Sequence, residues 1–274
     1  MKYKLAALAV SKMEAPFFRE WVEFHRIIGV EHFYIHDAMV DDSRAALQPY
    51  IDMGVVELFE EKRHPCQWEV YEEHFTGPRG EESEWLCVMD LDEFFVPKTF
   101  DNLQDWLTNF KDNVAAVGVA WTCFGSNGHV ERPEGLVIEN YLKTVNYDEG
   151  HHRWIKSIVR PTLIDKPVVD PHYFHPKKGY RFVNPLGNPI HTSEFEHNYP
   201  ISDIQVNHYV HKSRQDWNRK YKRGSPDIYG TMESRQRKLE AFDINEPNCN
   251  KVIDDCALRF LPELKRRLAL LNAL

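Results

Sequence analysis

The chain has 274 residues, of which 42 are acidic and 34 are basic, so its formal net charge is −8 at neutral pH. This length allows a large hydrophobic core, and the negative balance offers no basic face to nucleic acid or to an anionic membrane surface. No stretch approaches the ~18 consecutive apolar residues of a membrane span, and the apolar start is too short for a signal peptide. We therefore expect a cytoplasmic protein without an integral membrane segment.

The first half of the chain alternates between strand patterns and helical patterns. Residues 5–10 predict a central strand, and a helical pattern opens at Pro16 and ends at Gly29. Further strands are predicted at 30–36, 55–59, within 85–96 and at 114–121, and further helices at 44–50, 67–74 and 103–110. Because strands that alternate with helices pair in parallel, the sequence predicts an α/β protein with a mostly parallel sheet flanked by helices.

The pattern changes after a turn-rich loop at 123–129. Short strands separated by Pro and Gly are predicted at 154–159, 168–174, 180–183 and 201–206, which favours mixed or antiparallel pairing. The remaining chain is predicted to be helical at 215–223, 233–242 and 254–271, with a break or kink at Pro262. We expect a core of residues 1–212 and a helical C-terminal extension of residues 213–274 that packs on it.

The stretch 85–96 ends an apolar run with three carboxylates within four positions. In an extended chain Asp90 and Asp92 point to one side while Leu91 points to the core. Two such carboxylates suit Mg²⁺ or Mn²⁺, and ligands of open α/β sheets bind beyond the carboxyl ends of strands. An exposed acidic turn would give the same pattern, but the apolar residues 94–96 that follow make unpaired charge costly here.

Other polar residues fall near predicted strand ends. His208 and Lys212 follow the strand 201–206, where a neutral imidazole can bind a metal and an ammonium can bind phosphate. A surface turn with incidental histidines is the alternative. Lys156 and Arg160 lie four apart on a strand and so on one face. They suit contacts with a diphosphate or an acceptor, and solvated surface charge is an equal alternative.

The join between the first strand and the Pro16 helix carries Lys12 and Glu14, and Asp37 closes the second predicted strand. A helix that starts beyond a strand offers backbone N–H groups and a favourable dipole to anionic ligands. Simple capping of a helix or turn would also account for these polar residues.

A series of short motifs runs along the chain. They are Lys12-x-Glu14-Ala-Pro16, Arg19-Glu-Trp21, His25, Gly29-Val-Glu-His-Phe33, the segment 85–94, Trp121-x-x-Phe-Gly-Ser126, Gly128-His129, Arg132-Pro-Glu-Gly135, Lys156-Ser-Ile-Val-Arg-Pro161, Asn207-His-Tyr209 and Lys212-Ser213. In number and order these motifs resemble the glycosyltransferase family 2-like group that is related to family 92. The resemblance implies a GT-A fold that transfers a sugar from a nucleotide diphosphate sugar, expected to be a UDP-sugar, to a glycan or glycoconjugate acceptor. It also implies Mn²⁺ or Mg²⁺ and inversion of configuration.

The resemblance implies roles for single residues. Asp90 and Asp92 match the Asp-x-Asp pair that holds the metal on the donor diphosphate. His208 resembles the late histidine that completes the metal shell, and Lys212 resembles a diphosphate contact.

Lys12, Glu14 and Asp37 match positions that line the nucleoside pocket of the family. Met13 stands where the family usually has Asn, in Lys-Asn-Glu, so hydrogen bonding to the nucleotide is expected to differ locally.

An inverting transfer needs a group that takes the proton of the acceptor hydroxyl. Glu134 is the preferred base, because it lies in the loop after the predicted strand 114–121, the region where GT-A enzymes tend to place this group. Glu93 and His129 are its competitors, and an ordinary exposed glutamate would explain Glu134 as well.

Two further functions fit the same residues. A metal-dependent phosphohydrolase of nucleotide sugars could use Asp90, Asp92 and His208 and would release phosphate without an acceptor. A non-catalytic module for nucleotide sugars or glycans would bind the donor and leave it intact. Transfer is favoured over hydrolysis because a two-metal hydrolase would offer more clustered His and Asp ligands.

Overall fold

The computed structural model describes residues 1–63, 66–146, 154–168, 170–194, 202–223, 232–271 and 273. Its strands are β1 (Tyr3–Ser11), β2 (His32–Asp37), β3 (Val56–Glu60), β4 (Ser83–Val88), β5 (Glu93–Pro97), β6 (Val114–Cys123), β7 (Lys143–Thr144), β8 (Ile155–Val159), β9 (Arg181–Val183), β10 (Ile204–His208) and β11 (Val252–Ile253). Its α-helices are α1 (Phe18–Ile27), α2 (Ser43–Asp52), α3 (Gln67–Thr76), α4 (Leu103–Leu107), α5 (Val137–Asn140), α6 (Arg214–Arg223), α7 (Met232–Asn245) and α8 (Leu261–Leu271). None of the helices in these ranges combines the length and the apolar character that crossing a bilayer requires.

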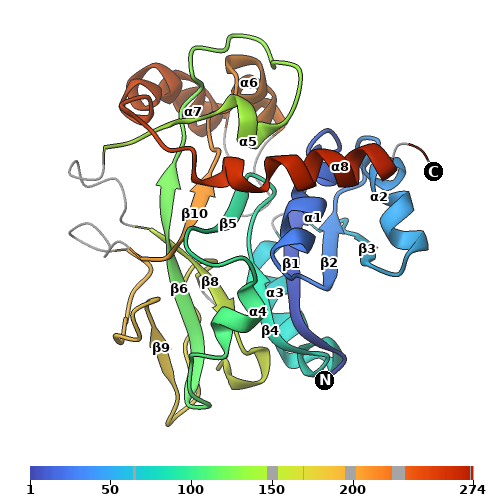
Figure 1. Cartoon of the computed structure of the whole chain (residues 1–274), viewed down its shortest axis with the longest axis vertical. Coiled ribbons are helices and arrows are strands. Elements are labelled where there is room, and N and C mark those ends of the chain that lie inside the picture. Colours follow the sequence, from blue (N-terminus) through green and yellow to red (C-terminus); the bar gives the residue numbers. More distant parts are fainter. Residues whose placement is uncertain are drawn as a thin grey trace.

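The centre of the molecule is a nine-stranded sheet in the order β3-β2-β1-β4-β8-β6-β10-β5, with β9 paired to β6 (Figure 1). The strands β5 and β8 run antiparallel to their neighbours, and the other pairs are parallel. This confirms the predicted α/β class and the mixed, mostly parallel pairing. The carboxyl ends of the parallel strands and the amino ends of β5 and β8 therefore meet at one edge of the sheet.

The sheet separates two hydrophobic layers, and β1 contributes to both. Leu5, Ala7 and Ala9 belong to the layer beneath α1, α2, α4 and α8. The alternate residues of β1 belong to the other layer, together with apolar side chains of α3. Alternation of side chains along a strand produces this division, and burial of both faces explains why β1 reads as a continuous apolar run.

The helix α1 presents a fully buried face to the sheet. Trp21, Phe24 and Ile28 are all 0% exposed, and the ring of Phe24 meets the ring of Phe260 edge-on at 5.3 Å. Figure 1 shows α8 lying across α1, so the end of the described chain covers its beginning. Gly29 ends the helix as predicted: its φ of +107° favours glycine, and a Cβ there would approach the Asn102 side chain to 2.7 Å.

The predicted strand at 168–174 is wrong for the residues of that stretch that the structure describes, which form no strand. The carboxylate of Asp170 accepts hydrogen bonds from the backbone N–H groups of His172 at 2.7 Å and Tyr173 at 3.2 Å. Such local bonds hold the backbone in a turn and compete with the ladder of a sheet.

The predicted C-terminal helix is also shorter than expected. A 3₁₀-helix covers Cys256–Phe260, and α8 begins only at Leu261, with Pro262 in its first turn rather than at an internal kink. Proline is tolerated in the first turn of a helix because its missing N–H has no partner there anyway.

Glu20 joins α1 to the start of α5, 117 positions later. Its carboxylate accepts hydrogen bonds from Val137 N at 2.7 Å and Ile138 N at 3.0 Å. Burial raises the pKa of Glu20 to about 7, although these two N–H groups act in the opposite direction. A proton on this carboxyl is therefore held more tightly in the folded than in the unfolded chain.

We expect Glu20→Gln to change how stability depends on pH. Because the folded-state pKa lies above the unfolded value, the stabilisation is complete below about pH 4.5 and is lost as the pH rises through 7. Glutamine does not titrate, so the variant should gain up to about 3 kcal/mol relative to the parent between pH 5 and pH 8. Urea unfolding at both pH values tests this, with the exposed Glu69→Gln as control. An equal difference at both values would contradict it.

Candidate functional site

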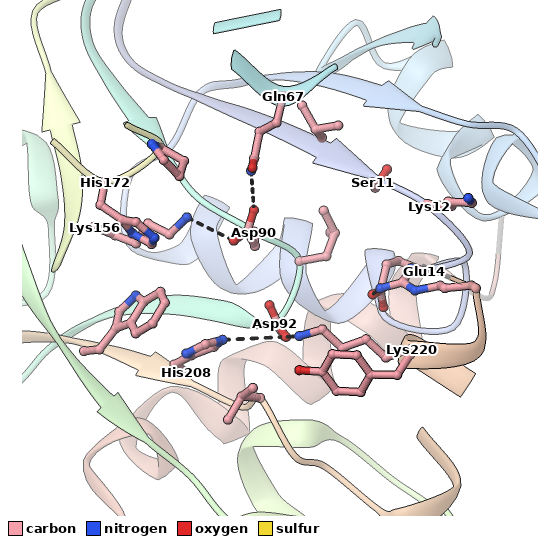
Figure 2. Close-up of a pocket in the computed structure, with 17 residues that line it drawn as sticks. Ser11, Lys12, Glu14, Gln67, Asp90, Asp92, Lys156, His172, His208 and Lys220 are labelled. Atoms are coloured by element: carbon pink, nitrogen blue, oxygen red, sulfur yellow. Dashed lines mark hydrogen bonds and ion pairs between the residues drawn. The ribbon is translucent and has the colours of Figure 1, made fainter. Parts of the chain in front are cut away.

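A pocket of about 220 Å³ opens at the carboxyl edge of the parallel strands (Figure 2). It is lined by residues from the end of β1, from the turn between β4 and β5, from β8 and β10 and from α6. Its charged and imidazole side chains are Lys12, Glu14, Asp90, Asp92, Lys156, His172, His208, Lys220 and Arg223. A pocket at this edge is where ligands of open α/β sheets usually bind.

The acidic stretch forms a turn and not one long strand. β4 ends at Val88 and β5 begins at Glu93. The Glu93 carboxylate accepts a hydrogen bond from Asp90 N at 2.9 Å, and Glu93 N donates to Asp90 O at 3.1 Å, which reverses the chain. Asp90, Leu91 and Asp92 all line the pocket, and Leu91 also packs in the hydrophobic core. The two carboxylates thus reach one pocket, but a turn brings them there and not the predicted alternation along a strand.

Asp90 is held by two side chains (Figure 2). It accepts hydrogen bonds from Gln67 Nε2 at 3.0 Å and from Lys156 Nζ at 3.0 Å. Lys156 is fully buried and also lies 3.4 Å from Glu93 Oε2. Burial lowers the pKa of Lys156, but the carboxylates of Asp90 and Glu93 outweigh burial and hold the pKa above its usual range. Burial raises the pKa of Glu93 to about 8 even with this ammonium beside it.

Asp92 lies on the other side of the turn, between β10 and α6. Its Oδ2 is 2.5 Å from Lys220 Nζ and 3.8 Å from His208 Nε2. Burial raises the pKa of Asp92, but the ammonium groups of Lys220 and Lys212, together with His208, hold it well below its usual range. Burial lowers the pKa of His208. At neutral pH the pair is therefore a carboxylate beside an uncharged imidazole.

The pair of Asp92 and His208 fits a divalent ion. Two ligands that each bind one ion at about 2.1 Å lie roughly 3–4 Å apart, and the oxygen and nitrogen here are 3.8 Å apart. A metal-binding imidazole must be uncharged, which the lowered pKa of His208 ensures. Within the described ranges no three His, Cys, Asp or Glu side chains form a metal-binding group. Mg²⁺ is typically bound by only a few protein ligands, and water and phosphate supply the others.

Residues 79–244 match the sequence profile of glycosyltransferase family 92. The chain belongs to this family. A family 92 protein of Ricinus communis is 28% identical over 270 residues, which cover 88% of this chain and 45% of that protein. A family 92 protein of Oryza sativa subsp. japonica is 28% identical over 189 residues, which cover 66% of this chain and 31% of that protein. The chain thus spans less than half the length of these curated relatives.

One solved structure is distantly similar to this family 92 chain. The crystal structure of HddC from Yersinia pseudotuberculosis aligns with 69% of this chain and 95% of its own, at 10% identity and a TM-score of 0.37. That score is too low for the similarity to support a fold assignment.

Two of the three residues matched to the nucleoside pocket of the family line the observed pocket. These are Lys12 and Glu14. Asp37 does not line it and is 0% exposed, and its carboxylate accepts hydrogen bonds from Ser11 Oγ at 2.5 Å and from Met39 N at 2.7 Å. Met13, the departure from the family pattern, has φ +57°, a conformation in which asparagine is favoured over methionine.

Lys212 does not line this pocket. Its ammonium lies 4.5 Å from the centre of the Phe17 ring, and Lys212 lines a smaller cavity between α6 and residues 13–17. It still contributes to the electrostatics of the site, because its charge lowers the pKa of Asp92. Direct contact of Lys212 with a diphosphate stays a prediction.

None of the three predicted base candidates lines the pocket. Glu134 is exposed, and its backbone oxygen accepts a hydrogen bond from Asn140. His129 is half-buried against the ring of Tyr141, and Glu93 is buried beneath the turn. Their roles stay predictions. Among the pocket-lining residues, Asp90 is a carboxylate that retains some exposure, with 34% of its side chain accessible.

Sequence reasoning missed one amide and two cations that line the pocket, namely Gln67, Lys220 and Arg223. Gln67 begins α3, and the other two lie in the last turn of α6. The run Arg219-Lys-Tyr-Lys-Arg223 is typical of a solvated helix face, which is why it carried no signal. The contacts that reveal its role span 128 positions to Asp92 and 209 positions to Glu14.

Proposed function

We propose that this chain is a metal-dependent glycosyltransferase of the GT-A type. It would move a sugar from a nucleotide diphosphate sugar, with UDP-sugars as the first donors to test, to a hydroxyl of a glycan or glycoconjugate, with inversion. Family membership supports the reaction class. The observation that carries the proposal is the convergence of Asp92, His208 and Lys220 in one pocket at the carboxyl edge of the sheet.

In this proposal Asp92 and His208 would hold Mn²⁺ or Mg²⁺, which would stabilise the charge of the departing diphosphate as a Lewis acid. Lys12 and Glu14 lie on the pocket wall that continues from β1, a position suited to the nucleoside. The hydrogen bond from Lys156 orients Asp90 at the pocket, where this carboxylate is placed to accept a proton or a hydrogen bond from a sugar hydroxyl. The buried Glu93 holds the turn through the backbone of Asp90.

A screen of nucleotide sugars tests the proposal. A donor at about 100 times its Kd should stabilise the protein by about 2.7 kcal/mol, which corresponds to a rise of several degrees in Tm. We expect this rise with a single class of donor in Mn²⁺ and its loss in EDTA. With a hydroxyl acceptor present, nucleoside diphosphate should be released in step with the glycosylated product.

The same screen separates the two alternative functions. A phosphohydrolase would consume the donor at full rate without an acceptor and would release nucleoside monophosphate and sugar phosphate. A binding module would show the thermal shift and leave the donor intact in every acceptor mixture. Either result would overturn the proposed transfer.

A further inference from the structure

The guanidinium of Arg223 has hydrogen-bond donors to spare. Its side chain is 8% exposed, and its Nη2 pairs with Glu14 Oε1. The Nε and Nη1 atoms are buried and have no hydrogen-bond partner among the described residues. Buried donors without partners are rare because each costs free energy, so a polar group that lacks one marks a place for a ligand.

The position of Arg223 suggests which ligand it lacks. The residue lines the main pocket and also the smaller cavity between α6 and residues 13–17. Each open N–H group of a guanidinium can donate a charge-assisted hydrogen bond to a separate phosphate oxygen. The open donors of Arg223 therefore suit an oxyanion that enters the pocket.

Lys220 lies one helical turn before Arg223 and so on the same face of α6. Each of these cations is held by a carboxylate at the pocket: Lys220 by Asp92 at 2.5 Å and Arg223 by Glu14. Both carboxylates lie on segments that follow strands of the sheet, β1 and β4. The last turn of α6 is thus attached to the pocket by two ion pairs that an incoming anion would compete for.

We propose that Arg223 and Lys220 form an anion site on α6 that receives the diphosphate of the donor. The identification of the anion as a donor diphosphate rests on the proposed function, whereas the anion site itself does not. Arg223 binds phosphate oxygens through Nε and Nη1 while Glu14 orients its Nη2. Lys220 transfers from Asp92 to the phosphate, which releases the Asp92 oxygen that a metal ion would use.

Substitutions at Glu14 and at Arg223 are expected to change anion binding in opposite directions. The negative charge of Glu14 neutralises Arg223 and repels a phosphate in the same place. Removing this charge should therefore strengthen anion binding, although it breaks the ion pair. If Glu14 and Arg223 only held α6 in place, removing either partner would act in the same direction.

Calorimetric titration with inorganic pyrophosphate in EDTA tests the anion site without donor or metal. We expect Arg223→Gln and Lys220→Met each to weaken binding by about 10-fold or more, the worth of a hydrogen bond to a charged group. Glu14→Gln should tighten binding by about threefold or more. Lys222→Met is the matched control, because this exposed lysine on the same helix removes the same charge and should change binding less than twofold.

The pattern of outcomes decides the proposal. Equal losses of pyrophosphate affinity in Arg223→Gln and Lys222→Met would show that only the overall positive charge matters. Weaker binding in Glu14→Gln would show that its ion pair with Arg223 is structural. Either result overturns the anion site. Thermal unfolding shows whether each variant folds. If Lys220→Met does not fold, the Arg223→Gln and Glu14→Gln results still decide the proposal. Donor turnover that survives Arg223→Gln at the parent's KM overturns the identification of the anion as the donor diphosphate but leaves the proposed function. If pyrophosphate binds as predicted but the protein turns over no donor, the anion site stands and the proposed function is overturned.

Discussion

Asp92→Asn is expected to abolish the Mn²⁺-dependent part of UDP binding and to lower transfer by about 10³-fold, since metal stabilisation of a leaving group is worth several kcal/mol. The substitution keeps the side-chain volume and removes the charge that would hold the ion beside His208. Titration of UDP in Mn²⁺ and in EDTA measures the first effect, and product formation at saturating donor measures the second.

Asp243→Asn is the matched control for Asp92. Asp243 also pairs with a cation of α6, Arg214, but it is 68% exposed and lies outside the pocket. This variant should keep both the affinity and the rate of the parent. Stimulation of UDP binding by Mn²⁺ that persists in Asp92→Asn would refute the metal assignment. Adding Lys220→Met restores charge balance around residue 92, so a folding defect in the single variant can be recognised and separated.

Lys156→Met is expected to cost about 3–5 kcal/mol of unfolding free energy at pH 9, the range for breaking a buried ion pair. Lys156 is 1% exposed and balances Asp90 and Glu93. The pKa of Glu93, already raised by burial to about 8, should rise further without this ammonium. Because the folded-state pKa is above the unfolded value, stability falls until the pH passes the folded pKa. The parent stops losing stability near pH 8, and the variant continues to lose it, so the deficit should grow from pH 6 to pH 9.

Urea unfolding of Lys156→Met at pH 6 and pH 9 measures this deficit. The double variant Lys156→Met/Glu93→Gln should lose the growth with pH, because the neutral amide does not titrate. Lys62→Met, a lysine whose side chain is 82% exposed, should cost little at either pH. A deficit of equal size at both pH values would show that Glu93 does not titrate against Lys156.

Local patterns were sufficient to predict most elements of the first half of the chain. The apolar run that became β1 is buried on both faces, and Gly29 has the backbone conformation that ends α1. The reversal at 89–92 was not visible, because apolar residues continue on both sides of the acids and only the hydrogen bonds of Glu93 break the strand. The strand predicted at 168–174 failed for a similar reason, since Asp170 bonds to its own neighbouring backbone.

The site was predictable where its residues follow strands and hidden where they lie on a helix. Asp92 and His208 end apolar runs, so their clustering follows from the meeting of parallel strand ends. Lys220 and Arg223 belong to a helix whose letters describe a solvated surface. Their function depends on how α6 is placed over the sheet, which is set by distant packing and not by local sequence.

The contact of α8 with α1 has a consequence for the order in which the protein can fold. Phe24 of α1 also packs against Phe260, in the 3₁₀-helix just before α8, although most of the sequence lies between them. During synthesis the part of α1 that packs against residues 256–271 emerges early and stays uncovered until that segment has been made. Contacts between residues far apart in sequence slow folding, and an apolar surface that is exposed in the meantime can associate with other chains. Nascent chains that end before α8 should therefore depend on chaperones, which protease protection of stalled ribosomal complexes can measure.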